Sequence, residues 1–212
     1  MIEDYKYYLH EKYNFDKSSW FAIGLAVWVI GGVLGFIYEI VFYYANSDFH
    51  FFFWRGSTFG PWLDVYCIAS LLIFVILYHL RRHPLLVFLI SAIGCSAIQL
   101  LIGLALYHFC SGLRLWNYNL EILNFGSIGG FICARSALVF GILGLLILYV
   151  FAPLVFRMGC YVRRNTFVAV WIVIGLICVA DILYNDVACV FLPGLIGAKD
   201  LYQALGLKYL TY

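Results

Sequence analysis

Four ionisable or strongly polar side chains interrupt apolar stretches of this 212-residue chain: Glu39, Gln99, Arg135 and Asp181. Side chains of this kind cost roughly 2.5 to 3.5 kcal/mol in hydrocarbon, so they usually face a bundle interior or a wet cavity. Two acids and a guanidinium in such a place could bind an ion or a ligand, or transfer a proton. We therefore expect a polar pocket inside a helical membrane protein.

The elements that must position these residues are long apolar helices. The chain is 65% hydrophobic and only 11% charged, whereas a soluble domain is about 25% charged. Five apolar runs approach the roughly 20 residues that a helical span needs, and the alternation typical of a membrane barrel is absent. We predict an all-α, polytopic transmembrane bundle with aromatic extracytoplasmic loops and spans at 20–42, 61–80, 85–109, 131–151 and 166–183. Residues 1–18 and 193–212 should be interfacial segments that flank a transmembrane domain of residues 19–192.

The distribution of basic residues predicts the orientation, because Lys and Arg favour the cytoplasmic side. Eight of them fall in the amino-terminal segment and in the second and fourth loops, against four on the other side. The expected location is therefore the cell membrane, multi-pass, with a cytoplasmic amino terminus. The apolar stretch Val187 to Ala198 is broken by Pro193-Gly194, and a half-span there is an alternative that would bring the carboxyl terminus inside.

Helical rise places the four polar residues at one depth. At 1.5 Å per residue, Glu39 lies about 28 Å from the inner start of its span, and Gln99 and Asp181 lie about 21 Å from theirs. Arg135, on an inward-running span, lies about 6 Å below its outer start. In a core of about 30 Å all four are in the outer half. The predicted binding set, with aromatic lids at Phe53 to Trp62 and around Trp116, is Glu39, Arg55, Gly60, Pro61, Tyr66, Gln99, Trp116, Tyr118, Arg135 and Asp181.

A purely structural alternative stays open for the same charges. Glu39 and Asp181 could pair with Arg55 and Arg135 only to fold the bundle, and we predict a contact of Glu39 with one of these arginines. Gly31-x-x-x-Gly35 should let a neighbouring helix approach closely, with homodimerisation as the weaker alternative.

Several partners and cofactors are not expected. Seven cysteines without a C-x-x-C spacing are expected to be packing thiols, so we predict no metal site and no cofactor. Nucleic acid is not an expected partner, because the net charge is only +2 and no basic block occurs. Membrane lipid is.

Two groups of residues resemble one known family, the putative ABC-transporter type IV family of small bacterial integral membrane proteins. Its Gly-Trp-x-Tyr-Glu span end is similar to Gly35-Phe36-Ile37-Tyr38-Glu39, and its Arg-Gly-x-x-Tyr-Gly-Pro loop is similar to Arg55-Gly56-x-x-Phe59-Gly60-Pro61. Further similarities, over about residues 30 to 185, are Trp116-Asn117-Tyr118-Asn119, Ile132-Cys133, Gly141, Pro153 as the end of the fourth span, and Asp181.

The departures from the family pattern lie in the charges. Gly130-Phe131 stands where the family has Gly-Arg, and Arg135 one helical turn later restores that charge. Asn117 replaces an Asp, and Gln99 stands near a position that is often acidic. The resemblance implies a permease-like role in a bacterial inner membrane. No nucleotide-binding motif is present in the sequence, so transport would need a separate protein partner or ATPase.

Three functions compete at this stage. The first is a transport-related or permease-like component with an outward-facing polar pocket. The second is a non-catalytic membrane module that binds a partner protein or lipid through the aromatic loops. The third is a membrane enzyme with Glu39 or Asp181 as general base and His50 or His108 as proton carrier. We do not favour it because no catalytic motif occurs. His79 and His83 are expected in a charged cytoplasmic rim.

Overall fold

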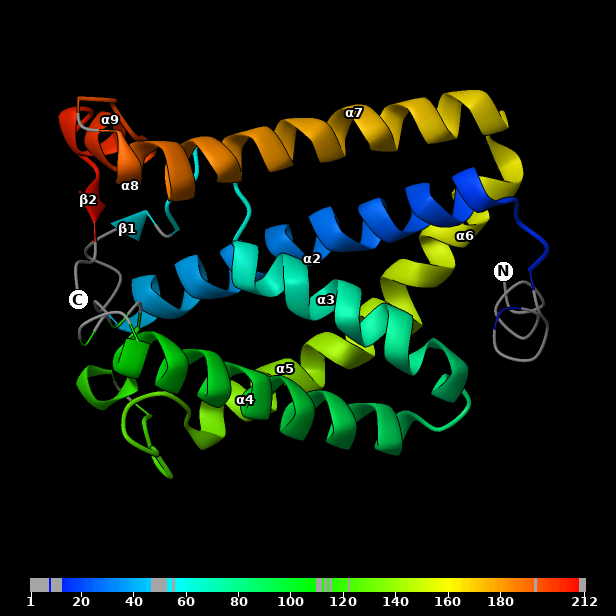
Figure 1. Ribbon diagram of the computed structural model, residues 1–212. Helices are drawn as coiled ribbons and strands as arrows, with labels where there is room; N and C mark the ends of the chain where they lie inside the picture. Colours follow the sequence, from blue (N-terminus) through cyan, green and yellow to red (C-terminus); the bar gives the residue numbers. More distant parts are fainter. Residues whose placement is uncertain are drawn as a thin grey trace.

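The chain folds as a bundle of long apolar helices that run alternately in opposite directions (Figure 1). The computed structural model describes residues 8, 13–46, 53–54, 56–109, 112, 114, 116–121, 123–192 and 194–209. Four of its helical stretches are long and apolar enough to cross a membrane, and Asp64–Leu80 is a shorter apolar one. The prediction of an all-α transmembrane bundle is therefore confirmed.

The elements follow the predicted spans closely, with differences at their ends. Helix α7 continues through a π-helical turn and α8, so the last long helix ends at Phe191 and not near 183. The stretch 187–198 is thereby divided between the end of this helix and the turn before α9. The bounds are α2 Lys17–Asn46, β1 Phe53–Trp54, α3 Asp64–Leu77, η1 Tyr78–Leu80, α4 Pro84–Phe109, η2 Tyr118–Leu120, α5 Ala134–Leu146, η3 Ile147–Phe151, α6 Ala152–Tyr161, α7 Arg164–Ile182, η4 Leu183–Ala188, α8 Cys189–Phe191, α9 Ala198–Ala204 and β2 Lys208–Tyr209.

Small residues bring α3 against α2 and α4 against α5. A Cβ atom on Gly31 would lie 1.9 Å from Ser70 Oγ, and one on Gly35 would lie 2.1 Å from Tyr66 Cγ. Gly141 and Gly144 of α5 meet Phe88 and Ser91 of α4 in the same way. The expected packing role of Gly31 and Gly35 is therefore confirmed, and Gly141 and Gly144 likewise allow two backbones to approach closely.

The family pattern predicts that the fourth span ends at Pro153, but the structure shows that the helix continues beyond it. The helix passes from α5 through the π-helical turn Ile147–Phe151 into α6 and ends at Tyr161. Proline lacks an N–H and its ring displaces the carbonyl one turn earlier, which bends a helix rather than stopping it when a π turn absorbs the strain. Figure 1 shows the resulting change of direction between α5 and α6.

Asp16 starts α2 and ties it to α7. Its carboxylate accepts hydrogen bonds from Ser18 N at 3.1 Å and Ser19 Oγ at 2.6 Å. It also forms an ion pair with Arg164 Nη2 at 2.9 Å. The pKa of Asp16 lies well below its ordinary range, chiefly because the Ser18 and Ser19 side chains donate to the ionised form.

The bundle end that carries Asp16 is closed by aromatic residues. Tyr8 is buried, and its ring meets that of Phe156 at 5.4 Å between centroids. Arg81 Nε donates to the Tyr8 carbonyl at 2.7 Å, and its guanidinium lies 4.1 Å from the Tyr78 ring centroid. The proposed interfacial character of 1–18 stays a prediction, because most of that segment lies outside the described residues. The opposite end gathers the long loops, where the polar spans were expected to converge (Figure 1).

Candidate functional site

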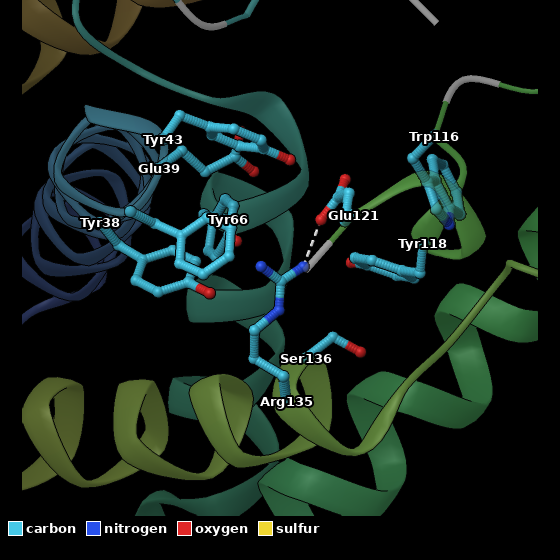
Figure 2. A pocket seen from close by; sticks show the side chains of 10 residues that line it. Tyr38, Glu39, Tyr43, Tyr66, Trp116, Tyr118, Glu121, Arg135 and Ser136 are labelled. Carbon is cyan, nitrogen blue, oxygen red and sulfur yellow. Dashed lines mark hydrogen bonds and ion pairs between the residues drawn. The ribbon is translucent and has the colours of Figure 1, made fainter. Parts of the chain in front are cut away.

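A polar cavity lies at the loop end of the bundle, between α2, α3, α5 and the loop that follows α4 (Figure 2). Its volume is about 40 Å³, which is room for a few water molecules. Three of its lining residues are charged and six are aromatic. The lining residues are Tyr38, Glu39, Phe42, Tyr43, Tyr66, Trp116, Tyr118, Glu121, Arg135 and Ser136.

Helix α2 contributes four residues, from two successive turns, to the lining of the cavity. Tyr38 and Phe42 are four apart, so they share a helix face, and their rings stack with centroids 6.0 Å apart. Glu39 and Tyr43 form the neighbouring row, and Tyr43 is buried. Tyr66 faces them from the first turn of α3, with its ring centroid 6.3 Å from that of Tyr38. Gly35 makes room for this tyrosine.

Arg135 enters the cavity from the first turn of α5. A capping box fixes that turn: Cys133 Sγ accepts from Ser136 N at 3.4 Å, and Ser136 Oγ accepts from Cys133 N at 3.2 Å. Arg135 forms an ion pair with Glu121, and the two side chains are only 11% and 5% exposed. Its guanidinium carbon also lies 4.0 Å from the centroid of the Phe42 ring.

The loop after α4 is held over the cavity by its own polar side chains. Trp116 Nε1 donates to the Phe131 carbonyl at 2.8 Å, and the Tyr118 N–H donates to the Gly130 carbonyl at 2.9 Å. Gln99 Nε2 donates to the Tyr118 hydroxyl at 2.9 Å. Burial of this phenol raises the pKa of Tyr118. The hydroxyl therefore stays protonated and can donate a hydrogen bond of its own.

Arg135 has donors left over. Its Nε and Nη1 atoms are buried and have no hydrogen-bond partner among the described residues. Figure 2 shows the guanidinium between the tyrosines of α2 and α3 on one side and Glu121 and Tyr118 on the other. Buried polar atoms usually find partners, so these two nitrogens mark a place where a polar ligand or ordered water would be stabilised.

Asp181 forms a different centre, on α7. Its Oδ2 accepts from the Gly60 N–H at 2.8 Å, and its Oδ1 accepts from the Phe59 N–H at 3.0 Å and from Asn185 Nδ2 at 2.8 Å. These bonds fasten the Gly56–Leu63 segment to the last span. A Cβ atom on Gly60 would lie 2.1 Å from the Trp62 ring, so any side chain there would force this ring to move.

The carboxyl-terminal segment joins the same centre. Asn185 Oδ1 accepts from the Ala198 N–H at 2.7 Å, and the Tyr202 hydroxyl donates to the Phe59 carbonyl at 2.6 Å. Strand β2 pairs with β1 in parallel, Lys208 opposite Phe53. We call Asp181, Asn185 and Tyr202 with their backbone partners the Asp181 clasp. It joins the Gly56–Leu63 segment to the end of the last long helix and to α9, which lie more than 100 residues later in the sequence.

The structure divides the predicted binding residues. Glu39, Tyr66, Trp116, Tyr118 and Arg135 line the cavity, and Gln99 stands behind them through its bond to Tyr118. Gly60, Pro61 and Asp181 lie outside the cavity lining, and the first and last of these belong to the Asp181 clasp. Arg55 lies outside the described residues, so the predicted contact of Glu39 with that arginine is not tested.

Glu121 is the charged member of the cavity that the sequence did not single out. It lies in the loop and not in a span, so the cost of burying a charge in hydrocarbon did not mark it. The available signal was its position as the one acid in the aromatic loop 110–125. No group of three or more His, Cys, Asp or Glu suited to a metal occurs in the described part of the chain.

Comparison with known proteins identifies one family. A family model described as putative ABC-transporter type IV matches residues 26–185. This range begins within α2, extends past the end of α7, and includes both the cavity and Asp181. No curated protein and no solved structure matches the chain.

Proposed function

The chain belongs to the putative ABC-transporter type IV family, and on that premise we propose that its cavity binds a small polar ligand as part of a transport process. The family and the apolar helices make it a transport-related membrane protein. The finer assignment depends on one observation: Glu39, Glu121 and Arg135 converge on a cavity in a chain with only 11% charged residues. Ionisable residues inside a membrane bundle usually mark a substrate or ion path.

The cavity is placed on the extracytoplasmic side in this proposal. The opposite end of the bundle carries Arg81, Arg82, Arg157, Arg163 and Arg164, and basic residues favour the cytoplasm. The ligand would therefore enter from outside or be held for release there. We assign binding and not catalysis to the cavity, since no nucleophile–base pair is among its lining residues.

A separate ATPase is the proposed energy source. At the proposed cytoplasmic end, α3 and η1 connect to α4 through residues 81–83, and α6 connects to α7 through residues 162–163. Turns of two or three residues have no room for a coupling helix that could receive a nucleotide-binding subunit. An ATPase would have to dock on the helix ends themselves or act through a further membrane subunit.

Native mass spectrometry of the full chain in mild detergent tests the binding proposal. We expect a stoichiometric small-molecule adduct on the wild-type protein. The double variant Arg135→Gln/Glu121→Gln should lose it. Replacing both residues removes the ion pair without stranding one buried charge, which a single substitution would do.

Arg114→Gln is the matched control. Arg114 lies in the same loop and contacts the Tyr107 and Phe131 rings at 4.9 and 4.7 Å, but it does not line the cavity. Its variant should keep the adduct. An adduct that survives the double variant, or a bare protein in every preparation, would contradict the proposal. A bound polypeptide in place of a small molecule would favour the alternative of a module that binds a partner protein.

A further inference from the structure

The Arg135 guanidinium packs between aromatic rings, but two of its nitrogen atoms have no hydrogen-bond partner among the described residues. Its guanidinium lies 4.0 Å from the Phe42 ring centroid and 5.6 Å from that of Tyr118. Only Nη2 meets Glu121, while Nε and Nη1 are buried without hydrogen-bond partners among the described residues. A guanidinium carries five N–H donors and commonly takes a carboxylate through two parallel bonds. Arg135 is therefore an oriented oxyanion receptor that is only partly occupied.

The position of Arg135 adds to this preference. It is in the first turn of α5, which continues through η3 and α6 to Tyr161. The amino-terminal end of a helix carries a partial positive charge and favours anions. The arginine and the helix end therefore act on the same part of the cavity.

The group now on Arg135 comes from a loop. Glu121 follows η2 and reaches inward with a side chain that is only 5% exposed. The remaining cavity of about 40 Å³ has room for only a few waters. A carboxylate that takes two parallel bonds from the guanidinium uses Nη2 together with either Nη1 or Nε, and Nη2 is the atom that Glu121 holds. Such a ligand therefore competes with Glu121 for Arg135.

We propose that Glu121 is a tethered competitor, and that the ligand of the cavity is a small monovalent carboxylate that displaces it from Arg135. This inference depends on the proposed function, because it assumes that the cavity binds a ligand. A carboxylate fits because its planar pair of oxygens matches two adjacent N–H donors of a guanidinium, whereas Glu121 contacts Nη2 alone. A monoanion fits better than a dianion because the Glu39 carboxylate lines the same cavity and like charges repel each other.

Hydrogen exchange of the wild-type protein gives the first test. The full chain in detergent is titrated with sodium acetate, and with sodium sulfate at equal ionic strength as the dianion. Acetate should bind saturably and accelerate amide exchange in 116–121, where the Tyr118 N–H bonds to the Gly130 carbonyl. Sulfate should not. Ligands usually slow exchange near their site, so protection of this loop by saturating acetate would overturn the displacement.

Glu121→Gln gives the second test, because removing a competitor should tighten binding. If Glu121 occupies Arg135 more than about nine-tenths of the time, its loss lowers the acetate Kd at least about tenfold. Arg135→Gln should abolish saturable binding. Asp200→Asn, on exposed α9, removes one negative charge elsewhere and should leave Kd unchanged. An unchanged or weaker affinity in Glu121→Gln overturns the inference.

The two proposals fail in different ways. Glu121→Gln leaves the Arg135 charge without its partner and can prevent folding, in which case the wild-type exchange experiment decides. If native mass spectrometry finds a cationic or neutral adduct and acetate does not bind, the carboxylate inference falls and the binding function stands. If neither an adduct nor acetate binding is found, both fall.

Discussion

Replacing Asp181 by Asn separates a fastening role from a ligand-binding role. The carboxylate accepts three hydrogen bonds of 2.8 to 3.0 Å, two from backbone N–H groups and one from Asn185. An amide has one oxygen, so it can replace Oδ1 and keep two of these bonds. Its NH₂ group then faces the Gly60 N–H, donor against donor.

The expected loss follows from these contacts. A hydrogen bond to a charged group contributes about 1.5–3 kcal/mol, and a stranded donor costs a similar amount. Since the site is only partly buried, we expect Asp181→Asn to lower the free energy of unfolding by about 2–3 kcal/mol. Reversible unfolding in detergent, followed by circular dichroism, measures this. Amide exchange at Phe59 and Gly60 should accelerate in the folded variant.

Asp200→Asn is the matched control for this experiment. The Asp200 carboxylate accepts one bond from the Gly197 N–H at 3.1 Å on an exposed residue, so its loss should cost less than about 1 kcal/mol. If the two variants unfold within about 0.5 kcal/mol of each other, the clasp does not stabilise the fold. The role predicted for Asp181 from the sequence, as a residue that binds a ligand, would then be favoured.

Two further predictions concern helix packing and a helix start. Gly35→Ala should destabilise the protein by about 1–3 kcal/mol, because its Cβ would lie 2.1 Å from Tyr66. Gly94→Ala is the control: its Cβ would have nothing within 4 Å, so this variant should be neutral or up to about 1 kcal/mol more stable. Equal effects of the two variants in unfolding experiments would refute the close packing of α2 and α3. The pKa of Asp16 is depressed mainly by Ser18. Asp16 should therefore stabilise the fold fully above its unfolded pKa of about 3.9, and progressively less as the pH falls toward its lower folded pKa. The stability difference between wild type and Asp16→Asn should shrink below pH 4, and a difference independent of pH would contradict this.

The level of the cavity along the helices could be predicted from the sequence, but its position around the bundle could not. Depth follows from a fixed rise per residue, and it correctly brought Glu39 and Arg135 to one level. It could not separate Asp181 from them, because the direction in which a side chain points depends on which helices are neighbours. That neighbour choice comes from contacts such as Gly35 against Tyr66, whose partner no single-sequence pattern specifies.

Other differences have equally local causes. Pro153 was expected to end a span because proline removes a hydrogen bond, yet the π turn before it lets the helix continue. Glu121 was missed because it lies in a loop, where an acid is unremarkable until the fold buries it. The family resemblance, in contrast, was readable from short motifs, and the match over residues 26–185 confirms it.

The shortness of α3 has a consequence for the surrounding lipid. Its 14 residues with the 3 of η1 measure about 27 Å, against about 39 Å for the 26 residues of α4. Figure 1 shows α3 starting well inside the ends of α2 and α4, so the Gly56–Leu63 segment descends to the depth at which its neighbours are still helical. Irregular backbone at that depth must be satisfied internally, which Asp181 and Tyr202 accomplish for Phe59 and Gly60. Hydrophobic mismatch should therefore thin the bilayer beside α3, and thick membranes should strain this side of the protein first.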